Sequence, residues 1–279
     1  MRHALILSIA CADRRGIVAR VAGYLADRGA NILDAQQYND ASNNRFFVRI
    51  EFDPLGAEAA DIEAGFVPIA DELALDWRLR SKARRGKVII MVSKFDHCLV
   101  DLLYRQQIGD LNMDVVGIIS NHPQPPGLNA IPFHYLPVTP STKHEQEAKV
   151  RAVIDESGAE LVILARYMQI LSDEMARYLS GRCINIHHSF LPGFKGARPY
   201  HQAHERGVKM IGATSHYVTA DLDEGPIIAQ DVEAISHRDT PEELVARGRD
   251  VERRVLARAV RAHLEDRIFL NGHRTVVFD

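Results

Sequence analysis

The stretch Lys87–Ser93 (KVIIMVS) decides the fold class of most of this sequence. Its apolar run does not alternate with polar residues, which is typical of a strand buried on both faces of a parallel sheet. Helices are expected downstream over 98–107 and 143–157, and further strands over 113–120, 133–138, 161–164 and 183–186. This alternation predicts a Rossmann-like α/β domain, with a mostly parallel sheet and helices on both of its faces.

The far end of this domain has clear local signals. Thr240 is a good helix N-cap, and Pro241 suits the first helical position. The helix is expected to run to about Glu265. Two short strands should then meet at the Asn271-Gly272 turn.

The sequence before Lys87 follows a different order. The expected elements are strands over 4–10, 31–38, 45–52 and 73–79, a helix from Ile17 that ends before Gly29, and a helix over 57–70. The order βαββαβ predicts a ferredoxin-like domain over residues 1–80. The polar, basic segment 81–87 suits a linker, which leaves residues 88–279 for the second domain.

Composition excludes several classes of protein. Of the 279 residues, 46% are apolar and 25% charged, which fits a globular chain and neither a disordered nor a fibrous one. The net charge of −3 gives no support for a nucleic-acid partner. Cys11, Cys98 and Cys183 lie too far apart for a disulfide framework or a thiolate zinc site. No apolar run reaches the roughly 18–20 residues of a membrane span, and no signal peptide is evident, so we expect a cytoplasmic protein without a membrane partner.

Polar residues that can carry chemistry follow the strand ending near residue 186. In Cys183–Pro192 (CINIHHSFLP), Asn185 and His187 are two residues apart, so both side chains leave the same face of a strand. Ligands of such sheets bind beyond the carboxyl ends of the strands. We therefore expect an amide and an imidazole to project together into that crevice.

A second polar segment, His216–Ile228 (HYVTADLDEGPII), contains an acidic turn with Asp221, Asp223 and Glu224. An amide and a protonated imidazole can stabilise an oxyanion, and a carboxylate can accept a proton and return it to a leaving amine. No GxSxG nucleophile motif is present, so water or an external amine would attack the carbonyl directly. Taken alone, these residues are as compatible with a functional site as with a packing pair and an ordinary turn.

Residues 183–231 resemble the folate-dependent formyltransferase family, whose core is Asn-x-His, Ser-x-Leu-Pro and Asp-x-Asp-x-Gly. Within it, the double histidine His187-His188 and the string Phe190–Ala203 (FLPGFKGARPYHQA) resemble the formyltetrahydrofolate deformylase family. The N-terminal domain resembles the ACT module that these deformylases carry. The likeness continues through Gly248–Glu252 to the Asn271-Gly272 turn.

The resemblance implies a hydrolase of a linear amide C–N bond. Water would cleave 10-formyltetrahydrofolate to formate and tetrahydrofolate, supplying formate for purine biosynthesis and balancing the one-carbon folate pools. No metal and no cofactor beyond the folate substrate are implied. The implied catalytic residues are Asn185, His187 and Asp223, and the implied substrate-binding residues are Tyr167, Met168, Gln169, Ile170, Leu171, His188, His216, Thr219 and Asp221. For His188, shaping the water pocket and packing behind His187 are equally open.

Two other enzymatic activities stay open. The first is formyl transfer to an amine such as glycinamide ribonucleotide, in which a glycine-rich loop after the first strand would hold the phosphate. Here that loop, Ser93–Cys98, has no glycine, and Asp96 would repel an anion, although Lys94 and His97 can contact one. The second is a metal-dependent amidohydrolase, because His201 and His204 have the i, i+3 spacing of ligands on a helix.

The ACT resemblance implies pairing of chains and an amino-acid effector bound between them. The implied effector residues are Asp13 and Gly16, near the first turn, and Asn31 and Ile32, at the start of the second strand. Glycine or methionine would fit a one-carbon role. The alternatives are a dimerisation platform without ligand and an amino-acid-sensing regulator that is not an enzyme. We expect a homo-oligomer in each case.

Overall fold

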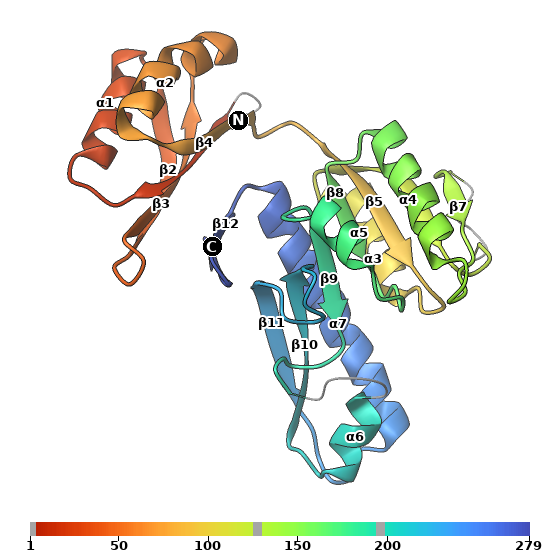
Figure 1. The fold of residues 1–279 in the computed structure, drawn as a ribbon. Coiled ribbons are helices and arrows are strands. Elements are labelled where there is room, and N and C mark those ends of the chain that lie inside the picture. The colour runs from red at the N-terminus through yellow and green to blue at the C-terminus, as the bar shows by residue number, and fades with distance from the viewer. Residues whose placement is uncertain (1–3, 125–129, 194–198) are drawn as a thin grey trace. The chain divides into compact units, whose positions relative to one another are not determined.

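The computed structural model describes residues 4–124, 130–193 and 199–279. The chain divides into two compact units (Figure 1). The first holds the residues up to Arg84 together with Glu265–Asn271 and Val276–Asp279, and the second holds Arg85–Leu264 and Gly272–Thr275. None of the helices within the described ranges is long and apolar enough to cross a bilayer.

The first unit has the βαββαβ order that the sequence predicts. Its elements are β1 (Leu5–Ala12), α1 (Ile17–Asp27), β2 (Asn31–Asp40), β3 (Arg45–Asp53), α2 (Ala59–Leu73) and β4 (Asp76–Ser81). The strands form an antiparallel sheet in the order β2-β3-β1-β4. Because α1 and α2 pack on one face of this sheet, the other face needs separate cover.

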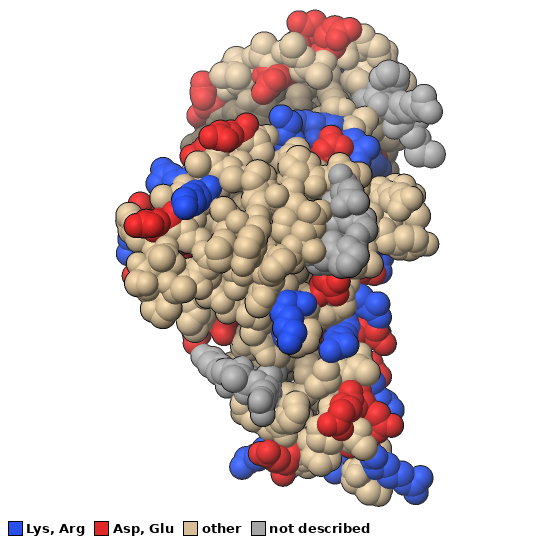
Figure 2. All heavy atoms as spheres, turned by 90° about the vertical axis from the view of Figure 1, so that its right-hand side faces the viewer, with Lys and Arg blue, Asp and Glu red and all other residues tan. Residues whose placement is uncertain are grey.

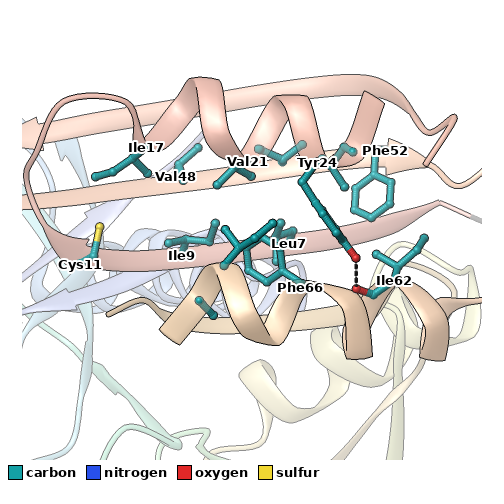
Figure 3. Close-up of a cluster of buried hydrophobic side chains, with 14 of the residues drawn as sticks. Leu7, Ile9, Cys11, Ile17, Val21, Tyr24, Val48, Phe52, Ile62 and Phe66 are labelled. Atoms are coloured by element: carbon teal, nitrogen blue, oxygen red, sulfur yellow. Dashed lines mark hydrogen bonds between the residues drawn. The ribbon is translucent and has the colours of Figure 1, made fainter. Parts of the chain in front are cut away.

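The core of this unit lies between the sheet and its two helices. Leu7 and Ile9 of β1 are two residues apart and belong to one core cluster with Val21 of α1 and Phe66 of α2, as Figure 3 shows. The hydroxyl of Tyr24 donates a hydrogen bond to a carbonyl of α2 at 2.6 Å. Burial of each large apolar side chain stabilises the fold by about 1.5–3 kcal/mol.

The end of the chain belongs to this same unit. Phe269 of β12 (Ile268–Asn271) packs on Phe47 of β3, with ring centroids 5.6 Å apart. The buried Arg49 side chain donates to the carbonyl oxygen of Glu265 at 3.0 Å. The sequence interpretation assigned the whole of 88–279 to the second domain, whereas the final residues group with the first because Phe47 and Arg49 face away from the helices and are buried by them.

The second unit contains a seven-stranded sheet in the order β11-β10-β9-β8-β5-β6-β7. The strands β9, β8, β5, β6 and β7 are parallel to one another, whereas β10 pairs antiparallel with both β9 and β11. The predicted mostly parallel sheet is therefore confirmed. The strands of this sheet are β5 (Gly86–Val92), β6 (Met113–Ser120), β7 (Phe133–Tyr135), β8 (Leu161–Leu164), β9 (Cys183–His187), β10 (Met210–Tyr217) and β11 (Ile227–Ala234). The last strand of the chain, β13 (Arg274–Val277), pairs with β12 in a separate two-stranded sheet.

Helices join these strands and cover the sheet (Figure 1). They are α3 (His97–Gln107), α4 (Lys143–Ser157), α5 (Asp173–Tyr178), α6 (Pro199–Glu205) and the long α7 (Pro241–Leu264). Apolar residues of β5, such as Ile89 and Met91, pack with Val150 and Ile154 of α4. The non-alternating run of β5 is thus explained by burial on both faces.

The strand order fixes where a ligand can bind. From β5 the chain runs outward through β6 and β7, and then returns to the other side of β5 with β8 and β9. The order reverses between β5 and β8, and the carboxyl ends of parallel strands at such a point border a crevice. The segments that follow Val92, Leu164 and His187 therefore meet at one edge of the sheet.

Candidate active site

A cavity of about 370 Å³ lies at this edge. Its walls are the loop after β8, the last residues of β9 and the turn after β10, which includes Val218, Leu222 and Asp223. Small-molecule sites commonly have volumes of about 300–1,000 Å³. The cavity is therefore large enough for a bicyclic ring, and three chain segments distant in sequence converge on it.

Asn185 is positioned by a histidine on the neighbouring strand. Asn185 and His216 lie opposite each other in the β9–β10 pair, and Asn185 Nδ2 is 3.2 Å from His216 Nε2. His216 Nδ1 lies 2.9 Å from the carbonyl oxygen of Tyr217, which can only accept, so Nδ1 carries the proton and Nε2 accepts from the amide. Burial lowers the pKa of His216, which keeps the ring neutral. One N–H of the amide is fixed in this way, and the other is available to a ligand.

His187 is oriented by a carboxylate. His187 Nδ1 lies 3.3 Å from Asp223 Oδ1. The hydrogen bond from His187 lowers the pKa of Asp223 and outweighs the opposing effect of burial, so the carboxylate is ionised at neutral pH. His187 is only 6% exposed, and its Nε2 has no hydrogen-bond partner among the described residues. Such an orphaned atom costs about 1–3 kcal/mol unless a ligand completes it.

The turn that carries Asp223 packs tightly on the end of β10. Asp223 has a φ of 58°, in the left-handed region. A Cβ on Gly225 would lie 1.7 Å from the carbonyl oxygen of Tyr217, and the backbone N–H of Tyr217 donates to Pro226 at 3.0 Å. Only glycine allows this approach, which explains the glycine of the Asp-x-Asp-x-Gly motif.

The structure brings most of the predicted substrate-binding residues to the cavity. Asp221 does not line it: this residue is exposed, and its carbonyl oxygen accepts a hydrogen bond from Thr219 Oγ1 at 3.0 Å. The residues that do line the cavity are Tyr167, Met168, Gln169, Ile170, Leu171, His188, His216 and Thr219. Residues 194–198 of the string that resembles the deformylases, and residues 125–129 of the loop after β6, lie outside the described residues.

The loop after β8 is anchored at its start. The hydroxyl of Tyr167 accepts a hydrogen bond from Gln146 at 3.0 Å inside the core. The backbone N–H of Met168 donates to Ser93 Oγ at 2.9 Å. These bonds fix the main chain at the start of the loop, so this wall of the cavity is pre-organised.

A cluster of polar side chains beside the cavity was not predicted from the sequence. Glu252 of α7 is 1% exposed, accepts from His97 Nε2 at 2.8 Å and from the Tyr200 hydroxyl at 2.7 Å, and pairs with Arg166 Nε at 3.4 Å. Burial opposes ionisation of Glu252, but these partners together hold its pKa below the ordinary value. A signal was present, since Glu252 lies next to Val251 and one turn before Val255 on the buried face of the helix.

The histidines considered for a metal site do not join the catalytic candidates. His201 lines a different cavity together with Glu252, and His204 is exposed. Among the described residues, the group spaced for metal binding is His97, Cys98 and Glu252. This group does not suit a cation, because Arg166 lies beside it and burial raises the pKa of the Cys98 thiol, which stays protonated.

The residues predicted to bind an effector fall into two groups. Asp13, close to Gly16 in sequence, accepts a hydrogen bond from Asn39 near the end of β2. Asn31 and Ile32 begin the same strand. Asn39 lies eight positions after Asn31 along the strand, so the two residues are about 26 Å apart at a rise of roughly 3.3 Å per residue. Within one chain, the two groups therefore lie at opposite ends of β2.

The comparisons with known proteins agree on one family. A family model described as formyl transferase matches residues 86–260, and one described as ACT domain matches residues 5–61. The chain is 50% identical over 284 residues to a formyltetrahydrofolate deformylase of Corynebacterium sp. (strain P-1), which covers 99% of this chain and 98% of that protein.

Solved structures give the same result. A formyltetrahydrofolate deformylase from Burkholderia mallei is 52% identical with a TM-score of 0.95, covering 99% of this chain and 100% of that one. Glycinamide ribonucleotide transformylase 1 from Symbiobacterium toebii is 30% identical with a TM-score of 0.65, covering 70% of this chain and 95% of that one.

Proposed function

The chain belongs to the formyltetrahydrofolate deformylase family, and we propose that it hydrolyses 10-formyltetrahydrofolate to formate and tetrahydrofolate. The convergence of Asn185, His187 and Asp223 on one cavity at the carboxyl edge of the sheet carries this proposal. Metabolically, the reaction supplies formate for purine biosynthesis and balances the folate pools. The cytoplasm is the compartment that we propose for it.

The pterin ring of the folate binds between the two walls of the cavity. One wall is the anchored loop 166–171, and the other is the turn 218–223. The formyl group on N10 then reaches the end of β9, where Asn185 and His187 lie. Exposed apolar side chains at the cavity, such as Met168 and Ile170, can cover the faces of a flat ligand.

In the first step, water attacks the formyl carbon and its carbonyl oxygen becomes an oxyanion. The free N–H of Asn185 and the protonated Nε2 of His187 donate hydrogen bonds to this oxygen. The Asp223 carboxylate orients the ring and compensates its charge. Asp223 also accepts a proton from the attacking water.

In the second step, the bond between the formyl carbon and N10 breaks. Asp223 passes its proton to N10, which leaves as the amine of tetrahydrofolate. The formyl carbon now carries the oxygen of water, and formic acid loses its remaining proton to give formate. One water is consumed, the electrons of the broken bond go to N10, and no group is oxidised or reduced.

Water is the acceptor because the neighbourhood of the site disfavours an anionic amine substrate. The carboxylate of Glu252 already binds His97, the residue after Asp96 in the segment Ser93–Cys98. A phosphate entering at this segment would meet the exposed carboxylate of Asp96, and the segment has no glycine to bring backbone N–H groups close to it. Formyl transfer to glycinamide ribonucleotide therefore remains the weaker candidate.

Formate release tests the proposal directly. The protein is incubated with 10-formyltetrahydrofolate alone, and formate and tetrahydrofolate are expected in equal amounts. Addition of glycinamide ribonucleotide should neither speed folate turnover nor yield formylated product. Activity should survive dialysis against a strong chelator, and its loss with recovery on adding zinc would instead support a metal-dependent amidohydrolase.

We further propose that the first unit pairs chains and binds an amino acid between them. Asp13 and Asn31 are too far apart in one chain to hold one small ligand, so two copies would each contribute one group. Calorimetry with glycine and with methionine, on wild type and an Asn31→Ala variant, tests the effector. No heat and no change of rate with either amino acid would leave a dimerisation platform.

A further inference from the structure

A second cavity of about 290 Å³ adjoins the first. The two share Arg166, Met168 and His188 as lining residues. The remaining lining residues of the second cavity include Phe95, His97, Tyr200, Arg249 and Glu252. A water in the liquid occupies about 30 Å³, so this space can hold a small ion with several waters.

Arg166 has hydrogen-bonding capacity that no described residue uses. It is 8% exposed, and its Nη1 atom is buried without a hydrogen-bond partner among the described residues. Its Nε pairs with Glu252 at 3.4 Å but makes no hydrogen bond among these residues. Its backbone is also in the left-handed region, with a φ of 65°. Buried guanidinium N–H groups are costly to leave unpaired, and strained backbone clusters at ligand sites. These features point to an anion that completes Arg166.

The charges around the second cavity favour a small anion. Arg166 and Arg249 both lie near the ring of Phe95, with guanidinium carbons 5.9 and 5.6 Å from its centroid. The carboxylate of Glu252 is the acidic group of the lining; it accepts hydrogen bonds from His97 and Tyr200 and pairs with Arg166, which leaves the charge of Arg249 without an acidic group in this lining. Two cationic groups therefore face one engaged anionic group.

We propose that the second cavity is a subsite for the carboxylate product, formate, with Arg166 as the residue that binds it. The proposal rests on the proposed function, because hydrolysis creates this anion in the first cavity. Hydrolysis of the bond between the formyl carbon and N10 turns a neutral amide and a water into an amine, a formate anion and a proton. With the folate still in the first cavity, the adjoining space offers the anion the Nη1 of Arg166, which has no partner among the described residues, and the nearby charge of Arg249.

His188 lies between the two cavities and gains a role from this arrangement. Its ring centroid is 5.4 Å from that of His187 and 6.3 Å from that of Tyr200. Burial, with the nearby Arg166 charge, lowers the pKa of His188 to about 3. Because the His188 ring is neutral, formate can pass it on the way from the first cavity to the second without being held there by an additional positive charge.

Binding of ¹³C-labelled formate to the protein saturated with tetrahydrofolate tests the proposal. Line broadening of the formate carbon gives the dissociation constant at fixed ionic strength. Arg166→Met should weaken binding by about 10- to 100-fold, the size expected for a lost charged hydrogen bond. Arg166→Lys should retain part of the affinity, and Arg249→Gln should weaken binding by about two- to five-fold, as expected for an exposed charge.

Arg253→Gln is the matched control. Arg253 lies on the same helix as Arg249, pairs with Asp250 and lines neither cavity. This variant should bind formate like wild type. If it weakens binding as much as Arg249→Gln, general charge and not a subsite explains the effect. Melting temperatures identify a variant that has lost its fold, and the exposed Arg249 keeps the test decisive if Arg166→Met is unstable.

The outcomes separate this inference from the proposed function. Formate release by the wild-type enzyme together with no formate binding, or with binding unaffected by Arg166→Met, overturns the subsite alone. No formate release by wild type overturns the proposed function. Stronger displacement of labelled formate by inorganic phosphate than by unlabelled formate would overturn the assignment to a carboxylate.

Discussion

Asn185 and His216 face each other across the β9–β10 pair, and the neutral imidazole accepts the hydrogen bond that fixes the amide. The Nδ1–H of His216 is committed to the carbonyl of Tyr217 and its Nε2 accepts from Asn185, so the neutral ring has no N–H left for the reaction. We therefore expect the histidine to act through Asn185, as a positioning residue.

Replacing Asn185 by alanine should lower kcat by about 10²–10³, because one oxyanion donor is lost. KM for the folate should change little, since the amide acts mainly in the transition state. Formate release at saturating substrate measures the effect. A variant with near wild-type kcat and an intact melting temperature would exclude Asn185 from the oxyanion site.

His216→Phe should lower kcat by about tenfold and leave KM nearly unchanged, because a free amide can rotate away from the oxyanion; a tenfold change corresponds to about 1.4 kcal/mol. His216→Gln offers an acceptor oxygen in place of Nε2 and should recover part of the rate. Steady-state kinetics of both variants test this. Equal losses in the two would indicate that His216 acts through packing.

Asp223→Asn should reduce kcat by about 10²–10⁴, the usual contribution of general acid–base catalysis. The asparagine keeps the shape of the turn but cannot accept and return a proton. The native carboxylate has a lowered pKa, so it stays ionised throughout the neutral range and loses activity only on acidification. Comparison of pH–rate profiles is the measurement, and an unchanged acid limb in the variant would contradict the assignment.

Gly225→Ala should damage activity through the backbone. The added Cβ would meet the carbonyl oxygen of Tyr217, so the turn with Asp223 must move away from β10. We expect destabilisation of about 1–3 kcal/mol, typical of overpacking, together with a large loss of kcat. Gly207→Ala is the control, since Gly207 has open space around it although its φ is positive. Similar kinetics in the two variants would argue against the proposed close approach.

Glu252→Gln should destabilise the fold by about 3–5 kcal/mol at neutral pH, because it leaves the buried Arg166 without its counter-charge. The folded-state pKa of Glu252 lies below its ordinary 4.5, so its contribution is complete above that pH and is lost as the pH falls through the folded value. Urea unfolding from pH 7 to pH 3 tests this. The difference between wild type and variant should shrink on acidification, and a constant difference would contradict the sign.

Most of the fold could be predicted from the sequence because the strands have distinct patterns of apolar residues. The non-alternating β5 and the capped helix α7 were predictable from residues alone. The strand β11 was not, since Gln230 and Asp231 interrupt the alternation of this edge strand. Asn185 and His187 stood out by their spacing, whereas their meeting with Asp223 followed from the family likeness and depends on the antiparallel return of β10.

The cluster of Arg166 and Glu252 escaped prediction for a physical reason. Glu252 stands in a helix rich in arginine and glutamate, where one more acid indicates a solvated surface. Its burial depends on Tyr200 and His97, which come from distant elements. In a similar way, no local pattern indicated that residues 265–271 would cover the sheet of the first unit.

Charged side chains of both signs are visible on one face of the molecule (Figure 2). Basic and acidic side chains are interspersed on the face shown in Figure 2, as expected for a chain with a net charge of −3. The described face thus offers no continuous basic surface for a nucleic acid.

Because Phe269 and the Glu265 carbonyl contact Phe47 and Arg49 of the first unit, no single cut in the polypeptide separates the two units. A fragment ending at Arg84 would leave the Phe47 ring and the Arg49 guanidinium uncovered and would be prone to self-association. Transfer of the first unit to another enzyme would therefore require the residues up to Arg84 together with the segment from Glu265 onward, either on two sides of the new partner or joined by circular permutation.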